Sequence, residues 1–204
     1  LREVQQCVDG LNEHNPMLGL RGCRLGIIYP EITIMQTRAI IGAAIQLKRE
    51  GFDPKPEIMV PLIETHKELR NQKEIIEKTA ESEFEREGIT VDYKIGTMIE
   101  VPRAALTADC IAPVADYFSF GTNDLTQMTF GYSRDDVGSF LPQYLEHKIE
   151  DEDPFQHIDQ NGVGLLVDMA VKKGRSIKPN LWCGVCGEHG GDPVSIKFFN
   201  KLGL

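Results

Sequence analysis

The chain has 204 residues, of which 41% are hydrophobic and 26% charged, a composition typical of a soluble globular protein with a sizeable core. Its formal net charge of −9 argues against a nucleic-acid partner, because phosphate backbones are bound by clustered Lys and Arg side chains. No apolar run approaches the roughly 18 residues that a membrane-spanning helix needs, and the first residues contain no hydrophobic signal core. We therefore expect no membrane partner, and a cytoplasmic location or, depending on the organism, an organelle matrix.

Five cysteines are spread along the chain, at positions 7, 23, 110, 183 and 186. Their number is odd, and a chain of this size does not need a disulfide framework to fold. The cysteines are therefore expected to be free thiols in a reducing compartment.

Extended apolar runs alternate with helical patterns along the chain, which is typical of a parallel α/β architecture. Five runs are predicted to be strands, and several of them have the continuous hydrophobicity of strands that are covered on both faces. They comprise residues 18–25, 57–63, 93–100, 116–121 and 181–185.

Helices are predicted between these runs from their end signals. One begins at Pro30 and ends at Gly51, because proline is favoured in the first turn of a helix and glycine just after the last. A second covers residues 64–86 and stops at Gly88, and two more cover residues 102–112 and 161–173. Residues 132–160 are irregular and acidic, and the segment is long enough to be an insertion.

The repeating order of strand and helix is compatible with a doubly wound sheet or with a (β/α)8 TIM barrel, and periodicity alone does not distinguish them. Five strands cannot close a barrel of eight. We predict an α/β fold, a partial (β/α)8 TIM barrel with about five of its eight strands. Residues 1–204 would then be a fragment of a single barrel domain, truncated at both ends.

Polar residues gather where three of the predicted strands end. Glu100 and Asp124 each follow an apolar run, and the carboxyl ends of parallel strands meet at one edge of a sheet. Two carboxylates at such an edge suit Mg²⁺, which takes one or two of them and leaves its other positions to water and substrate. The alternative interpretation is that both residues only cap the helices that follow. The turn 121–123, ahead of a helix, could present backbone N–H groups to an anion.

The stretch Gly-Thr-Asn-Asp-Leu-Thr-Gln at residues 121–127 resembles the signature of the phosphoenolpyruvate-utilising enzymes. Residues 96–102 are similar to the family's Glu-bearing motif, residues 15–21 to its Asn-Pro-x-Leu-Gly-x-Arg element, and Cys186 to its active cysteine. Within the family, residues 186–191 and 153–156 resemble the dikinase that acts on pyruvate more than the other members. The resemblance covers essentially the whole chain.

The resemblance implies a role for each matching residue. Glu100 and Asp124 would hold a Mg²⁺ cofactor that the carboxylate and enolate oxygens of phosphoenolpyruvate or pyruvate chelate. Cys186 would be the catalytic acid that protonates the methylene carbon of the enolate, and the base in the reverse direction. The remaining substrate-binding residues would be Gly121, Thr122, Asn123, Arg134 and Arg21.

The resemblance also implies a phosphotransferase that needs more than this chain. None of the five histidines stands in the context of the family's phospho-accepting histidine. The phosphohistidine domain and the ATP-binding domain would belong to the same full-length enzyme, a homodimer. The fragment alone is expected to be inactive.

Several other interpretations stay open at this stage. Within the family, the chain could come from a phosphoenolpyruvate synthase or from a phosphotransferase similar to enzyme I of the bacterial sugar system. In another class, Cys183 and Cys186 could form the active site of a thiol–disulfide oxidoreductase, although the glycines that follow disfavour the helix such a site requires. The fragment could also be a non-catalytic scaffold. His189 is equally consistent with a structural role and a contact to substrate.

Overall fold

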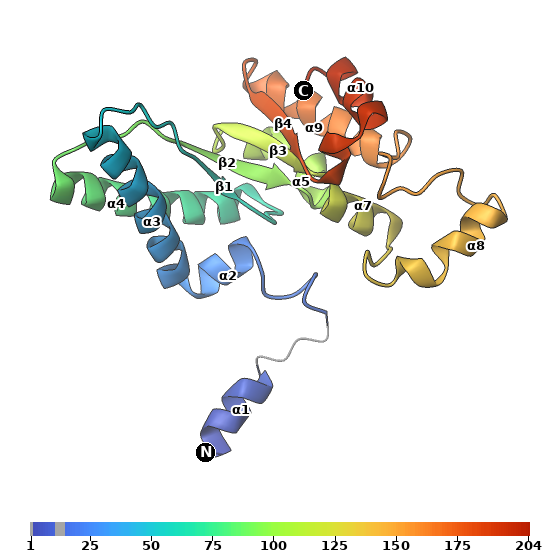
Figure 1. Ribbon diagram of the computed structural model, residues 1–204, viewed down its shortest axis with the longest axis horizontal. Coiled ribbons are helices and arrows are strands. Elements are labelled where there is room, and N and C mark those ends of the chain that lie inside the picture. The colour runs from blue at the N-terminus through green and yellow to red at the C-terminus, as the bar shows by residue number, and fades with distance from the viewer. Residues whose placement is uncertain (1, 11–14) are drawn as a thin grey trace.

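A computed structural model describes residues 2–10 and 15–204 of the chain, and its core is a parallel sheet of four strands (Figure 1). The strands are β1 (Glu57–Val60), β2 (Lys94–Ile99), β3 (Tyr117–Gly121) and β4 (Trp182–Cys186). They lie in the order β1-β2-β3-β4, so each strand pairs with the strand that precedes or follows it in the chain. The sheet therefore grows in one direction, without a reversal of strand order.

Helices connect the strands and extend beyond them. The α-helices are α1 (Arg2–Gly10), α2 (Cys23–Ile28), α3 (Pro30–Arg49), α4 (His66–Glu87), α5 (Pro102–Leu106), α6 (Ala108–Ile111), α7 (Thr122–Phe130), α8 (Leu141–Glu146), α9 (Val163–Ile177) and α10 (Pro193–Lys201). Two short 3-10 helices are η1 (Val137–Ser139) and η2 (Glu188–Gly191). Helix α1 has no buried residue and lies away from the sheet in Figure 1.

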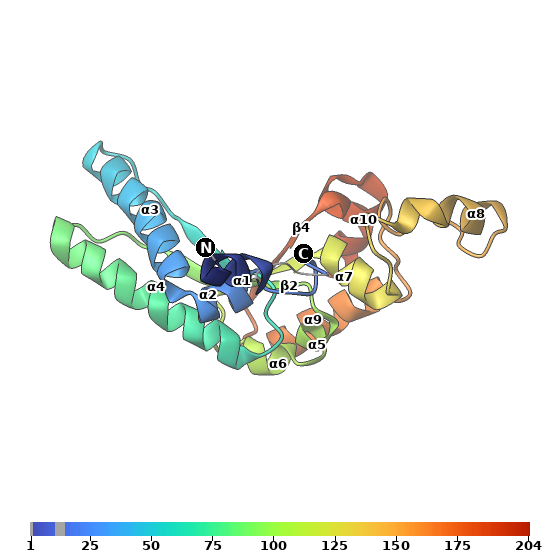
Figure 2. The same ribbon diagram turned by 90° about the horizontal axis from the view of Figure 1, so that it is seen from below.

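The two faces of the sheet carry different kinds of side chain. Successive residues of a strand point to opposite faces, and one face carries large apolar groups such as Ile99, Phe118 and Phe120, all fully buried. The helices α4, α5, α6 and α9 follow one another along this side (Figure 2). Phe118 packs so closely against α9 that a Cβ at Gly174 would lie 2.8 Å from its ring. This face therefore holds the main hydrophobic core.

The opposite face carries small residues together with the large side chains of Met98, Tyr117 and Trp182. The small residues on this face are Gly96, Ser119 and Gly184. An aromatic ring covers each glycine. A Cβ at Gly96 would lie 2.5 Å from the Tyr117 ring, and a Cβ at Gly184 would lie 2.6 Å from the Trp182 ring. The two rings meet edge to face, with their centroids 5.8 Å apart.

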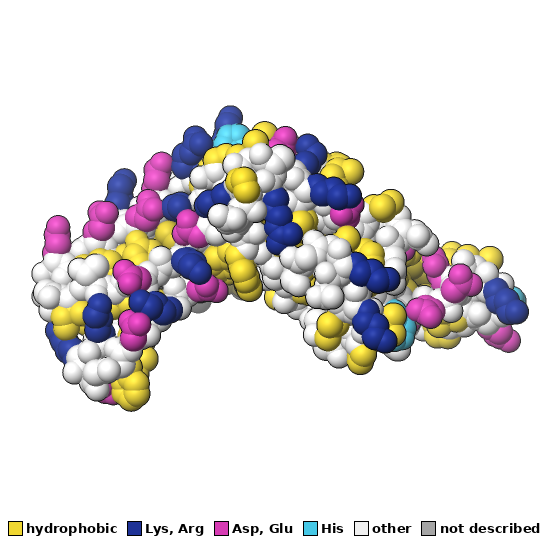
Figure 3. Space-filling model, turned by 90° about the horizontal axis from the view of Figure 1, so that it is seen from above, with side chains coloured by type: hydrophobic (Ala, Val, Ile, Leu, Met, Phe, Trp, Pro, Cys, Tyr) yellow, Lys and Arg dark blue, Asp and Glu magenta, His cyan; other side chains and the backbone are white. Residues whose placement is uncertain are grey.

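The body as a whole is arched (Figure 3).

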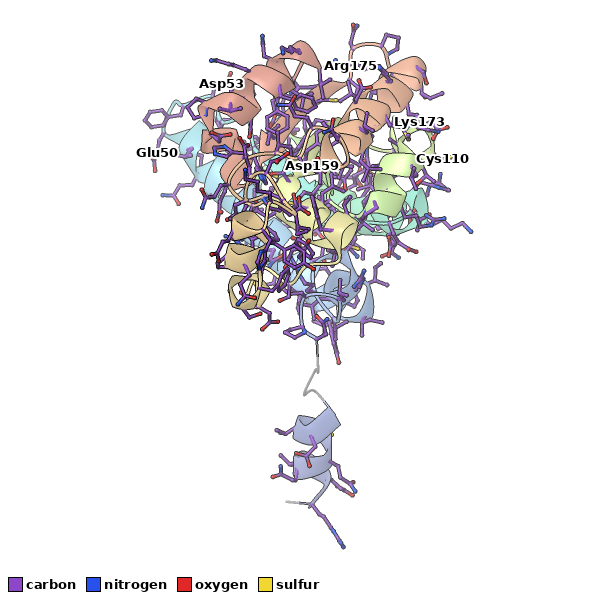
Figure 4. All side chains as sticks on the ribbon, turned by 90° about the vertical axis from the view of Figure 1, so that its right-hand side faces the viewer. Glu50, Asp53, Cys110, Asp159, Lys173 and Arg175 are labelled. Carbon is purple, nitrogen blue, oxygen red and sulfur yellow. The ribbon has the colours of Figure 1, made fainter. Side chains whose placement is uncertain are left out.

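Capping interactions fix the longer helices. Glu68 accepts a hydrogen bond from the backbone N–H of Thr65 at the start of α4, which ends at Gly88 in the left-handed conformation with φ 67°. The Asp159 carboxylate, labelled in Figure 4, accepts the N–H groups of Gly162 and Val163 at the start of α9. These interactions satisfy N–H groups that have no partner within the helix.

The prediction of a strand at residues 18–25 is wrong, and the sheet has four strands rather than five. The segment forms a turn followed by α2, because Gly22 has a φ of 56°, which does not continue a strand. Cys23 and Gly26, one helical turn apart, are then the buried residues of α2. The backbone N–H of Cys23 bonds to the Pro61 carbonyl oxygen beyond β1, so this segment still reaches the end of the sheet.

The other predicted elements are present with small differences. The helix predicted at 102–112 is divided into α5 and α6 at Thr107, whose hydroxyl bonds to the Arg103 carbonyl oxygen. The segment 132–160, predicted to be irregular, contains η1 and the short helix α8. Within the residues that the structure describes, no helix is long and apolar enough to cross a membrane.

Candidate functional site

The chemically active side chains come together at the carboxyl edge of the sheet. Glu100 follows β2 directly, Asp124 lies in the first turn of α7 after β3, and Cys186 ends β4. Gly121 pairs with Cys186 across the sheet, and a Cβ at Gly121 would lie 2.5 Å from the Glu100 Oε2 atom. Glycine is required at position 121 because the carboxylate occupies the space of a side chain.

Glu100 is a buried carboxylate with a fixed orientation. The residue is only 2% exposed. Its Oε1 atom accepts a hydrogen bond from the backbone N–H of Leu62 at 2.6 Å. Leu62 has a φ of 61°, an unusual left-handed conformation for a residue other than glycine. Burial first, and then the nearby Asp124 carboxylate, raise the pKa of Glu100 to about 7.

Asp124 is held by a cation and an amide. The Arg21 guanidinium donates to both carboxylate oxygens, each at 3.1 Å, and the Gln127 side chain donates to Oδ1 at 3.3 Å. Arg21 comes from the turn before α2 and its side chain is 34% exposed. The structure therefore brings three predicted site residues, Glu100, Asp124 and Arg21, into one cluster.

The residues present fit a hard divalent cation. The Asp124 carboxylate lies close enough to Glu100 to raise its pKa, and the nearly fully buried Glu100 has a backbone N–H as its hydrogen-bond donor. Mg²⁺ commonly binds through one or two carboxylates, whereas a structural zinc site needs four ligands. Among residues 2–10 and 15–204, no group of three or more His, Cys, Asp or Glu side chains could hold a metal ion. Two neighbouring carboxylates are a donor set that would suit magnesium.

Cys186 is a half-buried thiol beside this carboxylate pair. Its Sγ lies 3.5 Å from the Phe120 carbonyl oxygen, to which it donates. Burial raises the pKa of the thiol, and the negative charge of Glu100 also raises it. The thiol is therefore protonated at neutral pH and available as an acid.

Cys183 lies three residues earlier in β4, on the other face of the sheet. It is 4% exposed and belongs to the hydrophobic core, as the odd offset from Cys186 predicts. All five cysteines are free, and η2 follows β4 only after Gly187. This arrangement does not favour the dithiol alternative, which needs both sulfur atoms on one side.

Thr122 and Asn123 begin α7 and are both in contact with the loop after β4. Thr122 is fully buried, and its hydroxyl lies 2.7 Å from the Nδ1 atom of His189. The Asn123 side-chain oxygen accepts the backbone N–H of Glu188 at 3.2 Å. Gly187 permits this contact, because its φ is 114° and a Cβ there would lie 2.9 Å from the Thr122 hydroxyl.

Arg134 lies at the rim of the site rather than in the carboxylate cluster. Its guanidinium forms an ion pair with Glu188, and both side chains are largely exposed. Its backbone N–H donates to the Gln127 side-chain oxygen at 2.7 Å, and Gln127 also contacts Asp124. A cavity of about 480 Å³ opens beside Asp124, lined also by Met17, Gln127 and Tyr132.

Two residues at the site were not predicted from the sequence. Leu62 contributes a backbone N–H, and no side-chain pattern reveals such a role. The sequence left the role of His189, three residues after Cys186, open, and the structure shows that it is buried against Thr122.

Comparison with known proteins shows the family to which the chain belongs. Residues 2–204 match the PEP-binding domain of the PEP-utilising enzymes. The chain is 59% identical over 205 residues to "Pyruvate, phosphate dikinase" of Clostridium symbiosum, covering 100% of this chain and 24% of that protein. It is also 59% identical over 202 residues to "Pyruvate, phosphate dikinase 1, chloroplastic" of Arabidopsis thaliana, covering 99% of this chain and 21% of that protein. The identity to "Pyruvate, phosphate dikinase 2" of Oryza sativa subsp. japonica is again 59% over 202 residues, covering 99% of this chain and 23% of that protein. The chain thus spans less than a quarter of the length of these relatives. It belongs to the family of PEP-utilising enzymes, whose PEP-binding domain it matches from residue 2 to residue 204.

Proposed function

We propose that this chain is the phosphoenolpyruvate- and pyruvate-binding catalytic domain of a pyruvate, phosphate dikinase. In this proposal, a phosphoryl group passes between phosphoenolpyruvate and a phosphohistidine on another domain of the same enzyme. The observation that carries the proposal is the meeting of Glu100, Asp124 and Cys186 at one edge of the sheet. The identity to pyruvate, phosphate dikinases over the whole chain supports it.

Glu100 and Asp124 would hold Mg²⁺ in this function. A bound divalent cation supplies Lewis-acid stabilisation of the negative charge on the enolate oxygen. Arg21, which contacts Asp124, would neutralise charge on the phosphoryl or carboxylate group, and Arg134 would approach the same groups from the rim. The backbone N–H groups of the first turn of α7 would bind an anionic oxygen.

Cys186 would handle the proton at carbon. When the phosphoryl group leaves, the thiol gives its proton to the methylene carbon of the enolate, and a C–H bond of pyruvate forms as the S–H bond breaks. The thiolate then recovers a proton from solvent. In the reverse direction the thiol would first lose its proton to solvent, which its raised pKa opposes, and the thiolate would then remove a methyl proton from pyruvate. The raised pKa of the thiol supports its role as the acid.

We also propose that the sheet is part of a (β/α)8 barrel. The parallel strands follow one another in chain order, and the helices α4, α5, α6 and α9 lie along one face of the sheet. This arrangement supports a barrel rather than a doubly wound sheet, which has helices on both faces. Polar residues at the carboxyl ends of the strands are also where barrel enzymes place their sites. The ATP-binding and phosphohistidine domains, the homodimer, and a location in the cytoplasm or, depending on the organism, in an organelle matrix are parts of the same proposal.

Pyruvate turnover and exchange of the pyruvate methyl protons with solvent test the function in the full-length enzyme. Cys186→Ala should abolish both while leaving Mg²⁺ and oxalate binding unchanged. Cys183→Ser is the matched control, and it should exchange methyl protons close to the wild-type rate because Cys183 lies on the other face. Equal loss in both variants would contradict the single-acid mechanism and favour the dithiol alternative.

A further inference from the structure

His189 is a fully buried histidine with both ring nitrogens in hydrogen bonds. Nε2 lies 2.9 Å from the carbonyl oxygen of Pro154, and Nδ1 lies 2.7 Å from the hydroxyl oxygen of Thr122. A carbonyl oxygen can only accept, so Nε2 carries the proton of the ring. Burial lowers the pKa of His189 below its usual value, so the ring is neutral at physiological pH. Nδ1 is therefore an acceptor, and the Thr122 hydroxyl donates to it.

This assignment determines what Thr122 can offer to a ligand. A hydroxyl has one proton, and in Thr122 that proton is directed at His189 rather than at the mouth of the site. Gly187 also approaches the same hydroxyl closely. The donors that remain for an anion at the start of α7 are backbone N–H groups, whose direction depends on how firmly the first residue of the helix is held.

The second bond of His189 reaches the acidic segment 132–160. Pro154 belongs to this segment, which is fixed on both sides of it: the Asp153 carboxylate accepts the N–H of Phe155 at 2.8 Å, and the Ser195 hydroxyl accepts the N–H of Ile158 at 3.0 Å. His189 therefore connects an anchored segment, through one ring, to the first residue of α7.

We propose that His189 is a positioning residue for phosphoenolpyruvate. It holds the Thr122 hydroxyl as a donor and thereby orients the first turn of α7, whose backbone N–H groups bind an anionic group of the substrate. Its bond to Pro154 fixes the ring in the tautomer that this role needs. The inference rests on the proposed function, and it assigns His189 no contact with the substrate.

Two substitutions separate the two bonds. In His189→Asn, the side-chain oxygen takes the place of Nδ1 and still accepts from Thr122. In His189→Gln, the side-chain nitrogen takes the place of Nε2 and still donates to Pro154. In the full-length enzyme with Mg²⁺, His189→Gln should bind phosphoenolpyruvate about fivefold to tenfold more weakly, the worth of one neutral hydrogen bond. His189→Asn should bind it within about twofold of wild type.

His157→Gln is the matched control, because His157 lies in the same segment and contacts the Asp192 carboxylate instead of the site. Its affinity should not change. If wild-type enzyme does not bind phosphoenolpyruvate, the proposed function fails. If it binds and His189→Gln binds equally well, or if His189→Asn shows the larger loss, the positioning role is wrong.

Thermal unfolding shows whether each variant folds, and Thr122 offers an independent test should His189→Gln not fold. Thr122→Val removes the hydroxyl and should lose as much affinity as His189→Gln, whereas Thr122→Ser keeps the hydrogen bond to His189 and should lose less than Thr122→Val. Combining Thr122→Val with His189→Gln should add little further loss, because both remove the same bond. Wild-type affinity in Thr122→Val, or additive losses in the double variant, would overturn the inference.

Discussion

At the scale of single residues, the charged form of the buried Glu100 carboxylate lowers the stability of the folded chain when no cation is bound. Its pKa is about 7 in the folded chain and 4.5 ordinarily, so between these values the folded state binds the proton more readily. The contribution of Glu100 to stability therefore falls as pH rises from about 4.5 to 7.

Replacing this carboxylate should stabilise the metal-free protein. With a chelator present at pH 8, Glu100→Gln should raise the free energy of unfolding by roughly 2–3 kcal/mol, because a neutral amide removes the buried charge. At pH 4.5 the difference should vanish. Denaturant unfolding at both pH values measures it, and Mg²⁺ should stabilise the wild type alone. An identical pH dependence in both proteins would contradict the raised pKa.

Arg21 occupies both oxygens of Asp124, which is one of the two proposed ligands of Mg²⁺. Arg21→Met removes a competing cation, so Mg²⁺ alone should bind roughly fivefold more tightly, equivalent to about 1 kcal/mol for a partly exposed ion pair. Phosphoenolpyruvate should bind more weakly in the same variant, because a cation near its anionic groups is lost.

Calorimetric titrations with Mg²⁺ and with phosphoenolpyruvate measure the two opposite effects of Arg21→Met. Arg103→Met is a suitable control, since Arg103 donates to the Glu64 carbonyl oxygen outside the carboxylate cluster. Weaker Mg²⁺ binding in Arg21→Met would mean that Arg21 organises the metal site instead of competing for it.

The Glu100 carboxylate occupies the space that a side chain at position 121 would need. A Cβ at this position would lie 2.5 Å from Oε2 and 2.6 Å from the Met98 sulfur, so Gly121→Ala must displace the carboxylate. We expect a loss of about 1–3 kcal/mol in stability from overpacking, and loss of Mg²⁺ binding. Gly190→Ala should bind Mg²⁺ normally, because the nearest atom there is 3.7 Å away. Mg²⁺-dependent thermal shifts distinguish the two variants.

The sequence was sufficient to place side chains at the site but not to assign their partners. Glu100, Asp124 and Cys186 could be predicted because each follows a strand, and parallel strands end at one edge. The contact of Arg21 with Asp124 joins residues that lie 103 positions apart, and its geometry depends on the turn before α2. The donor from Leu62 is a backbone group in a left-handed conformation, which no pattern of side chains encodes.

At the scale of elements, predictions succeeded where local signals and tertiary structure agree. Helix α4 was predicted to within two residues because it has a capping acid at its start and Gly88 at its end. The segment 18–25 failed because an apolar run of this length fits a strand or a short helix equally well. Gly22, in a left-handed conformation against Pro61 and Leu62, decides in favour of the helix, and that contact is not local.

Two glycines, one inside a helix and one at the end of another, should have opposite effects on the free energy of unfolding when each is replaced by alanine. Gly42 lies inside α3 and a Cβ there would meet no atom within 4 Å, so Gly42→Ala should stabilise the protein by about 0.5–1 kcal/mol. Gly88 ends α4 with a φ of 67°, and Gly88→Ala should destabilise it by about 1 kcal/mol. Denaturant unfolding of each variant measures both effects. A shift of equal sign in the two would contradict the assigned backbone conformations.

At the scale of the whole molecule, the open sheet has two free edges. In the part of the chain that the structure describes, β1 pairs with β2 alone and β4 with β3 alone. A strand edge presents unpaired N–H and C=O groups that can pair with another chain. A closed barrel has no such edges, so the proposed barrel would remove both by adding strands beyond β1 and β4.

The isolated 204-residue chain should therefore associate with itself, while a longer chain that completes the barrel should not do so through these strands. We expect a sedimentation coefficient that rises with protein concentration, and no turnover of pyruvate with ATP or pyrophosphate. Met59→Pro offers a direct test on β1, because Lys94 donates to the Pro56 carbonyl oxygen, so that Ile58 and Val60 pair with β2 and the N–H of Met59 faces the free edge. Association should weaken in this variant. A chain that stays monomeric at all concentrations and unfolds cooperatively would show that its edges are not open, and would contradict the partial barrel.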